Sequence, residues 1–356
     1  MSNSPLDFLI IGQGLAGSLL AWHLHQLGQR ILVIDRSNPQ SASRMAAGLI
    51  NPVTGKRLVK SSGVDTYLTH AQHCYEQLQQ QFDQVFFHAR PMCRLFQSDD
   101  EIAFWEKRKN DTEYQAYLGK RFNPDSHPTF KDPAGSFQQL QTGYLDTVAL
   151  LDTLDTYFRE NHISTHRDVD YQHIRFDKNV AYLDDIQTKH IIFCEGYKAT
   201  TNPWFSWLPF KPAKGEILTL NIQDHLEQDI INAGKWLLPL NNGQFKLGAT
   251  YEWTPLDEKP TQQGQNTLLD ALKLLYRNKV EIEVVNHQAG VRPCTKDTMP
   301  FIGQHPTNHH LSIFNGFGSK GSLMIPYYAK QFSQHLLGKQ ATLTEADIKR
   351  YWKHDS

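Results

Sequence analysis

The feature that most constrains this 356-residue chain is a glycine-rich turn between a buried strand and a helix close to its start. The run 7–11 is almost entirely apolar, which is typical of a strand buried on both faces of a parallel sheet. It leads directly into Gly12-Gln-Gly-Leu-Ala-Gly17. Apolar residues then recur at helical spacing over 15–27, and a second apolar run ends at Asp35. Strand, turn, helix and strand together predict a βαβ unit.

Each glycine of this turn meets a separate steric demand. In a dinucleotide-binding turn, Gly12 permits the tight turn, Gly14 lets a pyrophosphate approach the backbone, and Gly17 lets the helix pack closely on the strand. Phosphates then lie at the helix N-terminus, where free N–H groups and the helix dipole favour negative charge. The unit therefore predicts dinucleotide binding. The alternative is a glycine turn that serves chain packing alone.

The end of the second strand bears on which dinucleotide binds. Asp35 lies about 20 residues beyond the turn, where a carboxylate accepts hydrogen bonds from ribose hydroxyls and disfavours a 2′-phosphate. Arg36 either accommodates a 2′-phosphate or is an exposed charge at the end of a strand. The βαβ unit by itself leaves NAD and FAD as alternatives.

The composition indicates an ordinary globular protein. The chain has 36 Lys and Arg against 37 Asp and Glu, a formal net charge of −1, and 40% of its residues are hydrophobic. This balance argues against a disordered chain and against a nucleic-acid binder that relies on a basic field over the whole molecule. The length predicts about two domains.

The cysteines and the N-terminal segment predict a cytoplasmic protein. The four cysteines are far apart and form no CxxC pair, which indicates a reduced setting; they are Cys74, Cys93, Cys194 and Cys294. Glycines interrupt the first apolar run and no basic segment precedes it. We therefore expect neither a signal peptide nor a membrane span.

Helical and strand patterns alternate along the rest of the chain. Helices are expected over 64–82, 99–119, 146–161, 264–277 and 322–337, and strands over 85–96, 163–169, 180–183 and 190–194. The segment 203–285 has period-two patterning, which predicts a second, mainly antiparallel sheet. We therefore predict an α/β fold in which insertions split the nucleotide-binding domain.

A second strand, glycine turn and helix lie near the C-terminus. The strand-like run 311–315 precedes Gly316-Phe-Gly-Ser-Lys-Gly321, and a helix follows. The free N–H groups at the start of this helix favour a bound anion, as those after the first glycine turn do. One helix N-terminus can therefore serve a pyrophosphate, and the other an anionic flavin ring.

Taken in order along the chain, these motifs resemble the D-amino-acid oxidase or glycine oxidase (DAO) family of FAD-dependent oxidoreductases. The segment 290–303, with Arg292, Thr295 and Asp297, is especially similar to glycine oxidase. It also resembles the oxidase domain of the bacterial bifunctional enzyme that matures 5-methylaminomethyl-uridine in tRNA, and the turn 316–321 is closer to that branch. We expect no methyltransferase domain, and hence not the bifunctional enzyme itself.

The resemblance implies a cofactor and a domain organisation. The fold it implies has a Rossmann-like FAD-binding domain of the glutathione-reductase type (1–82, 143–200 and 287–356) and an inserted α+β, mainly antiparallel-sheet substrate domain (83–142 and 201–286). The residues that it places at FAD are Gly12, Gly14, Leu15, Ala16, Gly17, Asp35, Arg36, Ser43, Ala47, Gly48, Val169, Gly196, Arg292, Gly316, Phe317, Gly318, Ser319, Lys320 and Gly321.

The chemistry that the resemblance implies is oxidation of a C–N bond by hydride transfer to flavin N5, after which water hydrolyses the imine. Arg292 is the candidate for binding a substrate carboxylate, because its planar fork forms bidentate pairs; the alternative is a salt bridge within the protein. Lys320 and the helix N-terminus beside it are candidates for stabilising the anionic reduced flavin.

Two further residues are candidates for the reaction. Tyr251 is a candidate hydrogen-bond donor to the substrate, or it packs at a strand end. Lys246-Leu-Gly248 is similar to the sarcosine-oxidase pattern, in which a strand lysine near the flavin promotes reaction with oxygen. The alternative for Lys246 is a solvated strand lysine.

Three functions follow from these observations. The leading one is an FAD-dependent oxidase or dehydrogenase of a small amino acid or secondary amine, with oxygen or another electron acceptor as its partner. The second is a tRNA wobble-uridine (carboxymethylaminomethyl) modifying oxidoreductase, with phosphates on the basic runs 56–60 and 107–109. The third is a non-catalytic dinucleotide-binding protein. No metal is expected, because no third ligand set accompanies the histidine pairs 70 and 73 or 309 and 310.

Overall fold

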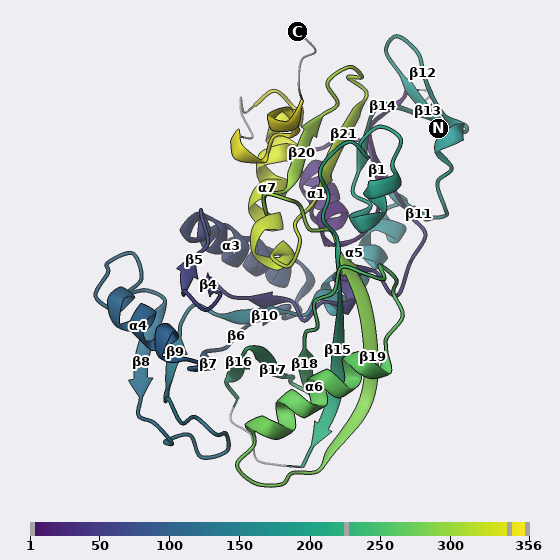
Figure 1. Ribbon diagram of the computed structural model, residues 1–356. Helices are drawn as coiled ribbons and strands as arrows, with labels where there is room; N and C mark the ends of the chain where they lie inside the picture. The colour runs from purple at the N-terminus through teal and green to yellow at the C-terminus, as the bar shows by residue number, and fades with distance from the viewer. Residues whose placement is uncertain (1–3, 224–227, 340–343, 353–356) are drawn as a thin grey trace. The chain divides into compact units, whose positions relative to one another are not determined.

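The computed structural model describes residues 4–223, 228–339 and 344–352. The chain forms two compact units, each built from discontinuous segments (Figure 1). Unit 1 contains Met1–Arg44, Thr147–Ala213 and Val291–Ser356, and unit 2 contains Met45–Asp146 and Lys214–Gly290. No helix in the described ranges is long and apolar enough to cross a membrane.

Unit 1 is built on a sheet whose centre is parallel. Strand β1 lies between β2 and β14 and is parallel to both, with Leu9 opposite Leu32 and Ile191. Strand β21 pairs with β14 in parallel and with β20 antiparallel. The strands are β1 (Leu6–Ile11), β2 (Ile31–Asp35), β11 (Ser164–His166), β12 (Ile174–Phe176), β13 (Ala181–Leu183), β14 (Ile186–Phe193), β20 (Phe301–Gln304) and β21 (Leu311–Asn315). The predicted βαβ unit is therefore confirmed.

Apolar side chains explain why these strands pair. Leu9, Ile34, Ile191 and Phe193 are fully buried in one cluster, as expected for strands covered on both faces. The helices of unit 1 are α1 (Leu15–Gln26), α5 (Thr147–Glu160) and α7 (Gly321–Leu336), and α1 packs against both of the others (Figure 1). Short 3₁₀ turns lie at Tyr171–His173, Gly196–Thr201, Thr344–Ala346 and Ile348–Tyr351.

Unit 2 contains an eight-stranded sheet in the order β19-β15-β18-β17-β16-β7-β9-β8. The pairs from β15 to β16 and from β7 to β8 are antiparallel, while β16 and β7 are parallel. The strands are β7 (Met92–Leu95), β8 (Leu118–Phe122), β9 (Ser136–Gln139), β15 (Ala213–Ile222), β16 (Ile230–Ala233), β17 (Lys235–Pro239), β18 (Phe245–Gly248) and β19 (Ile282–Arg292). The mainly antiparallel second sheet is confirmed.

Smaller elements complete this unit. The remaining strands are β3 (Leu49–Ile50), β4 (Val53–Thr54), β5 (Val59–Lys60), β6 (Phe87–Ala89) and β10 (Gly143–Leu145), and the helices are α3 (Val64–Phe82), α4 (Asp99–Arg108) and α6 (Gln262–Leu275). The four-residue helix α2 (Ala42–Met45) crosses the boundary between the two units in the chain.

The unit boundaries differ from the domain boundaries expected from the sequence. Residues 45–82 belong to unit 2, because β3 pairs with β10 and the Gln79 carboxamide accepts hydrogen bonds from the N–H groups of Phe86 and Phe87. Residues 201–213 belong to unit 1, where the Lys211 N–H donates to the Cys294 carbonyl at 2.7 Å. Backbone pairing between distant segments decides these boundaries.

Two predicted elements are wrong in their extent. The helix predicted over 99–119 ends at Arg108, and the chain then turns and enters β8. The buried Tyr114 makes this turn, because its hydroxyl accepts from the Lys60 N–H at 3.2 Å. The strand predicted over 85–96 is two strands, β6 and β7, separated by Pro91, which has no N–H to donate to a ladder.

A buried carboxylate fixes helix α6 on strand β15. Glu216 is fully buried, and its oxygens accept from the N–H and hydroxyl of Thr261, the N-cap of α6, at 2.9 and 2.8 Å. His287 lies 2.7 Å from the same carboxylate. A Cβ atom on Gly264 would lie 2.2 Å from Glu216 Oε2, so the close approach requires glycine.

Gly264→Ala should therefore destabilise the protein by about 1–3 kcal/mol, since the added methyl group displaces a buried, fully hydrogen-bonded carboxylate. Urea unfolding measures the change. The control is Gln263→Ala, an exposed position one residue earlier on α6 that should change stability by less than about 0.5 kcal/mol. Equal stability of both variants would contradict this account of the α6 contact.

Candidate functional site

The first glycine turn lies at the carboxyl end of β1, where the backbone leaves no room for side chains. Gly12 has a φ of +103°, and a Cβ atom on it would lie 2.4 Å from the Cys194 carbonyl oxygen. A Cβ atom on Gly17 would lie 1.8 Å from the Gly12 carbonyl oxygen. The turn is thus pressed between β14 and the first turn of α1, as a dinucleotide-binding turn requires.

The polar loop after β2 reaches the same turn. The Ser43 hydroxyl accepts from the Leu15 N–H at 3.0 Å and lies 3.1 Å from the position of a Cβ atom on Gly14. Gly14 is the N-cap of α1, so no N-cap side chain covers this helix N-terminus. The structure therefore brings together Ser43 and the N-terminus of α1, where a phosphate is favoured.

Asp35 ends β2 beside this turn. Its carboxylate accepts from the Gln13 N–H at 2.7 Å and from the Ser37 N–H at 2.6 Å. These bonds orient the carboxylate at the edge where a ribose-binding acid stands in such folds. Arg36 is exposed, and Val169 is partly buried against the core of the sheet.

Glu195, which follows β14 at the same edge, is not among the site residues predicted from the sequence. Its carboxylate accepts from the Tyr171 hydroxyl at 2.6 Å and from the Asn202 carboxamide at 2.8 Å. Burial raises the pKa of Glu195 to about 7, against the lowering effect of these two hydrogen bonds. The carbonyl of Gly196 accepts from the Asn315 side chain at 2.9 Å. An acid directly after a buried apolar strand was the available signal.

The second glycine turn follows β21 and leads into α7. Gly316 and Gly318 have φ values of +82° and +54°, and the Gly318 N–H donates to the Pro293 carbonyl at 3.2 Å. Lys320 occupies the N-cap position of α7, and burial lowers its pKa. Phe317 is buried, Ser319 is exposed, and the partly buried Arg292 ends β19 next to Pro293.

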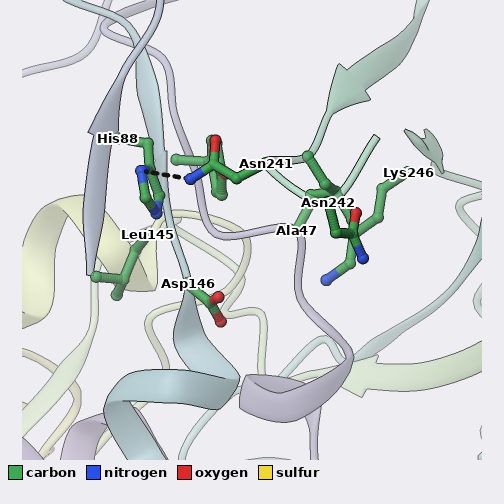
Figure 2. Close-up of a pocket in the computed structure, with 9 residues that line it drawn as sticks. Ala47, His88, Leu145, Asp146, Asn241, Asn242 and Lys246 are labelled. Carbon is green, nitrogen blue, oxygen red and sulfur yellow. Dashed lines mark hydrogen bonds between the residues drawn. The ribbon is translucent and has the colours of Figure 1, made fainter. Parts of the chain in front are cut away.

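Unit 2 contains a pocket of about 220 Å³ (Figure 2). Its polar side chains come from strands and loops far apart in the chain, and its lining residues are Ala47, His88, Tyr144, Leu145, Asp146, Leu240, Asn241, Asn242 and Lys246. The Lys246 ammonium group donates to the Ala46 carbonyl at 3.4 Å. Burial lowers the pKa of Lys246, and Asp146 opposes this effect.

Two other predicted residues of unit 2 have different surroundings. A Cβ atom on Gly48 would lie 1.9 Å from the Leu145 carbonyl oxygen, so this glycine holds the loop against β10. Tyr251 is 50% exposed and contacts the Trp253 ring edge-on at 5.3 Å, outside the pocket. The structure thus places Ala47 and Lys246 together in the pocket of unit 2, and Arg292 and Lys320 in unit 1.

The histidine pairs do not form a metal site within the described ranges, where no group of three or more metal-ligating side chains occurs. Both ring nitrogens of His310 lie within hydrogen-bonding distance of backbone carbonyls, at 2.8 Å from Lys189 and 3.0 Å from Asp177. The His310 ring therefore links the segment before β21 to the backbone at Lys189 and Asp177, all within unit 1.

Comparison with known proteins identifies the family. The profile of the family described as FAD dependent oxidoreductase (DAO) matches residues 7–335. The chain belongs to the DAO family of FAD-dependent oxidoreductases. The glycine turns, Ser43 and Asp35 fit this cofactor, because the turns admit phosphate to the backbone at a helix N-terminus and the acid stands at the ribose position.

Individual relatives agree with the family. The chain is 24% identical to the tRNA 5-methylaminomethyl-2-thiouridine biosynthesis bifunctional protein MnmC of Marinobacter nauticus over 94% of its own length and 56% of that relative's. It is 23% identical to the uncharacterized oxidoreductase YurR of Bacillus subtilis, covering 97% and 98% of the two chains. Glycine oxidase from Geobacillus kaustophilus has the same fold, with a TM-score of 0.84, 18% identity and coverage of 98% and 100%.

These comparisons confirm the predicted family, the FAD cofactor and the oxidoreductase class. The chain spans about half the length of the bifunctional relative. Membership in a family of oxidoreductases leaves the non-catalytic alternative without support.

Gly17→Ala should abolish FAD binding, or weaken it at least tenfold, because the added methyl group collides with the Gly12 carbonyl and separates α1 from β1. The flavin-to-protein absorbance ratio of the purified protein measures this loss. Gln26→Ala, at an exposed position at the other end of α1, is the control. Full FAD content in the Gly17 variant would contradict the assignment.

Glu195→Gln should change how stability depends on pH. Because the folded protein binds the Glu195 proton up to a pKa of about 7, whereas the unfolded chain releases it near 4.5, native stability falls as pH rises through this window. The variant keeps a neutral side chain at every pH, so the stability of the native protein relative to the variant should fall by on the order of 2 kcal/mol between about pH 5 and pH 8. Urea unfolding from about pH 5 to pH 8 measures this, with the exposed Glu160→Gln as the control. Parallel pH profiles of native and Glu195→Gln proteins would refute the shifted pKa.

Proposed function

We propose that this enzyme oxidises the C–N bond of a small amino acid or secondary amine in the cytoplasm. The observation that carries the proposal is the pocket of unit 2, which at about 220 Å³ suits a small molecule and carries both an ammonium group, Lys246, and a carboxylate, Asp146. Such a pair suits a zwitterionic amine. The glycine oxidase fold of structural relatives supports the substrate class, and the four free cysteines support the reduced compartment.

A specific observation keeps tRNA as a second candidate substrate, namely the similarity to the tRNA-modifying MnmC protein. Two cations of the basic runs pair with carboxylates, Lys60 with Asp65 at 2.8 Å and Lys109 with Glu106, which reduces the charge that these runs offer to tRNA phosphates. We therefore place the small amine first. Tight, salt-sensitive tRNA binding without activity on small amines would reverse this order.

FAD, when bound, supplies the acceptor for the hydride from the carbon next to the amine. Arg292 is the residue we propose for the substrate carboxylate, which its planar fork can bind in a bidentate pair. Lys320 and the first N–H groups of α7 would stabilise negative charge on a bound flavin. Lys246 supplies a cation for the reaction with oxygen. Water then hydrolyses the imine product.

A panel of amines tests the reaction class. Under anaerobic conditions, glycine, sarcosine, proline or a D-amino acid should bleach the flavin absorbance of the holoenzyme, which requires no assumption about the electron acceptor. Arg292→Lys should raise the KM for the active amine roughly tenfold to a hundredfold, because lysine cannot form the bidentate pair. Absence of bleaching with every amine would overturn the proposal.

Lys246→Met should slow the reaction of the reduced holoenzyme with oxygen by at least tenfold, if oxygen is the acceptor, and leave the limiting rate of anaerobic reduction at saturating amine nearly unchanged. Stopped-flow absorbance separates the two half-reactions. Lys235→Met on β17 is the matched control, since this ammonium group instead donates to the Ala249 carbonyl at 2.8 Å. An unaltered rate with oxygen would remove Lys246 from this role.

A further inference from the structure

The pocket of unit 2 contains a hydrogen-bonded chain that fixes the proton of a histidine. The Arg90 guanidinium donates to the Asn241 carboxamide oxygen at 2.6 Å, and to the side chain and carbonyl of Gln228 at 2.6 and 3.0 Å. The Asn241 carboxamide nitrogen lies 3.2 Å from His88 Nδ1 (Figure 2). His88 stacks on the Tyr144 ring, with ring centres 4.7 Å apart.

The donor and acceptor roles in this chain follow from chemistry. A guanidinium group donates and never accepts, so the atom of Asn241 that faces Arg90 is the oxygen. The amide nitrogen therefore faces His88, and this nitrogen donates. His88 Nδ1 must accept, which leaves the proton of the neutral ring on Nε2.

The surroundings of His88 keep the ring neutral. Burial lowers its pKa, the nearby Arg90 lowers it further, and Asp146 opposes both effects. Figure 2 shows Nδ1 turned to Asn241 and the other ring nitrogen on the opposite side, toward Leu145 and Asp146. The hydrogen bond that the structure gives the His88 ring is the one at Nδ1. An oriented N–H donor thus lines a pocket that also holds an ammonium group, Lys246.

We propose that His88 is a specificity-determining residue, whose Nε2–H donates to an oxygen acceptor on the side chain of the amine substrate. The acceptor is a carboxylate or a carboxamide oxygen, because the Lys246 ammonium group in the same pocket can also donate to such an oxygen. The inference rests on the proposed function, and it narrows the substrates to amino acids with an acidic or amide side chain.

The chain offers a charge-matched pair of variants. In Asn241→Asp, a carboxylate oxygen faces His88 Nδ1, so the ring must carry its proton on Nδ1 and present Nε2 as an acceptor. In Asn242→Asp, the same change occurs in the neighbouring pocket residue, whose side chain bonds to Gln244 instead. The two variants alter the net charge equally, and the first alone reverses the hydrogen bond offered by His88.

The first measurement needs no turnover. In ¹⁵N-histidine-labelled holoenzyme at about pH 8, well above the ordinary histidine pKa of about 6.5, NMR should report Nε2–H for His88 in the native protein and in Asn242→Asp, and Nδ1–H in Asn241→Asp. Added propionate or propionamide should shift the His88 Nε2 resonance of the native protein. A native Nδ1–H tautomer, or no shift with either probe, would overturn the inference, even if amines reduce the flavin.

The second measurement concerns specificity. Anaerobic flavin reduction by aspartate, asparagine and alanine, each in D and L form, gives the preference for a side-chain acceptor. Asn241→Asp should lower the preference of aspartate or asparagine over alanine at least tenfold, which corresponds to about 1.4 kcal/mol, whereas Asn266→Asp, the same charge change at an exposed position of α6 outside the pocket, should change it less than twofold. The better of the two substrates separates a carboxylate from a carboxamide. An equal effect of both variants, or alanine as the preferred substrate, would refute the inference, whereas reduction by none of the amines would refute the proposed function.

Discussion

The close approach of backbone segments at the carboxyl end of β1 is the constraint on which the rest of unit 1 depends. Gly17 meets the Gly12 carbonyl, and Gly12 meets the Cys194 carbonyl, at distances that exclude any Cβ atom. These contacts hold β1, β14 and the start of α1 together. Because parallel strands end at one edge, the loops after β2 and β21 arrive there as well. The edge at which we propose that the cofactor binds is therefore formed by how the sheet packs.

In each unit, a buried carboxylate joins separate segments of the chain through hydrogen bonds. Glu216 joins α6 to β15 in unit 2, and Glu195 joins the loop after β14 to neighbouring segments in unit 1. A carboxylate removed from water is tolerated when its oxygens are hydrogen-bonded, as both of these are. Burial raises the pKa of Glu195 to about 7. The cofactor edge of unit 1 thus contains a group that titrates near neutral pH.

The predictions from sequence succeeded for elements whose conformation is set by residues close together in the chain. The first βαβ unit, helix α3 and the turn before α7 were predicted, because glycine spacing and apolar periodicity are properties of short segments. The helix predicted over 99–119 failed beyond Arg108, because the buried Tyr114 turns the chain. Its contact with Lys60 is distant in sequence and left no local signal.

The sequence by itself determined the family and, through it, the cofactor. It also determined where backbone segments approach one another, because only glycine fits such close contacts. The tertiary structure decided which polar side chains share a pocket. His88, Asn241 and Lys246 come from separate strands and loops, and the proton position on His88 depends on Arg90 through Asn241. Such a chain of donors and acceptors is set by three-dimensional contacts, so no spacing in the sequence could reveal it.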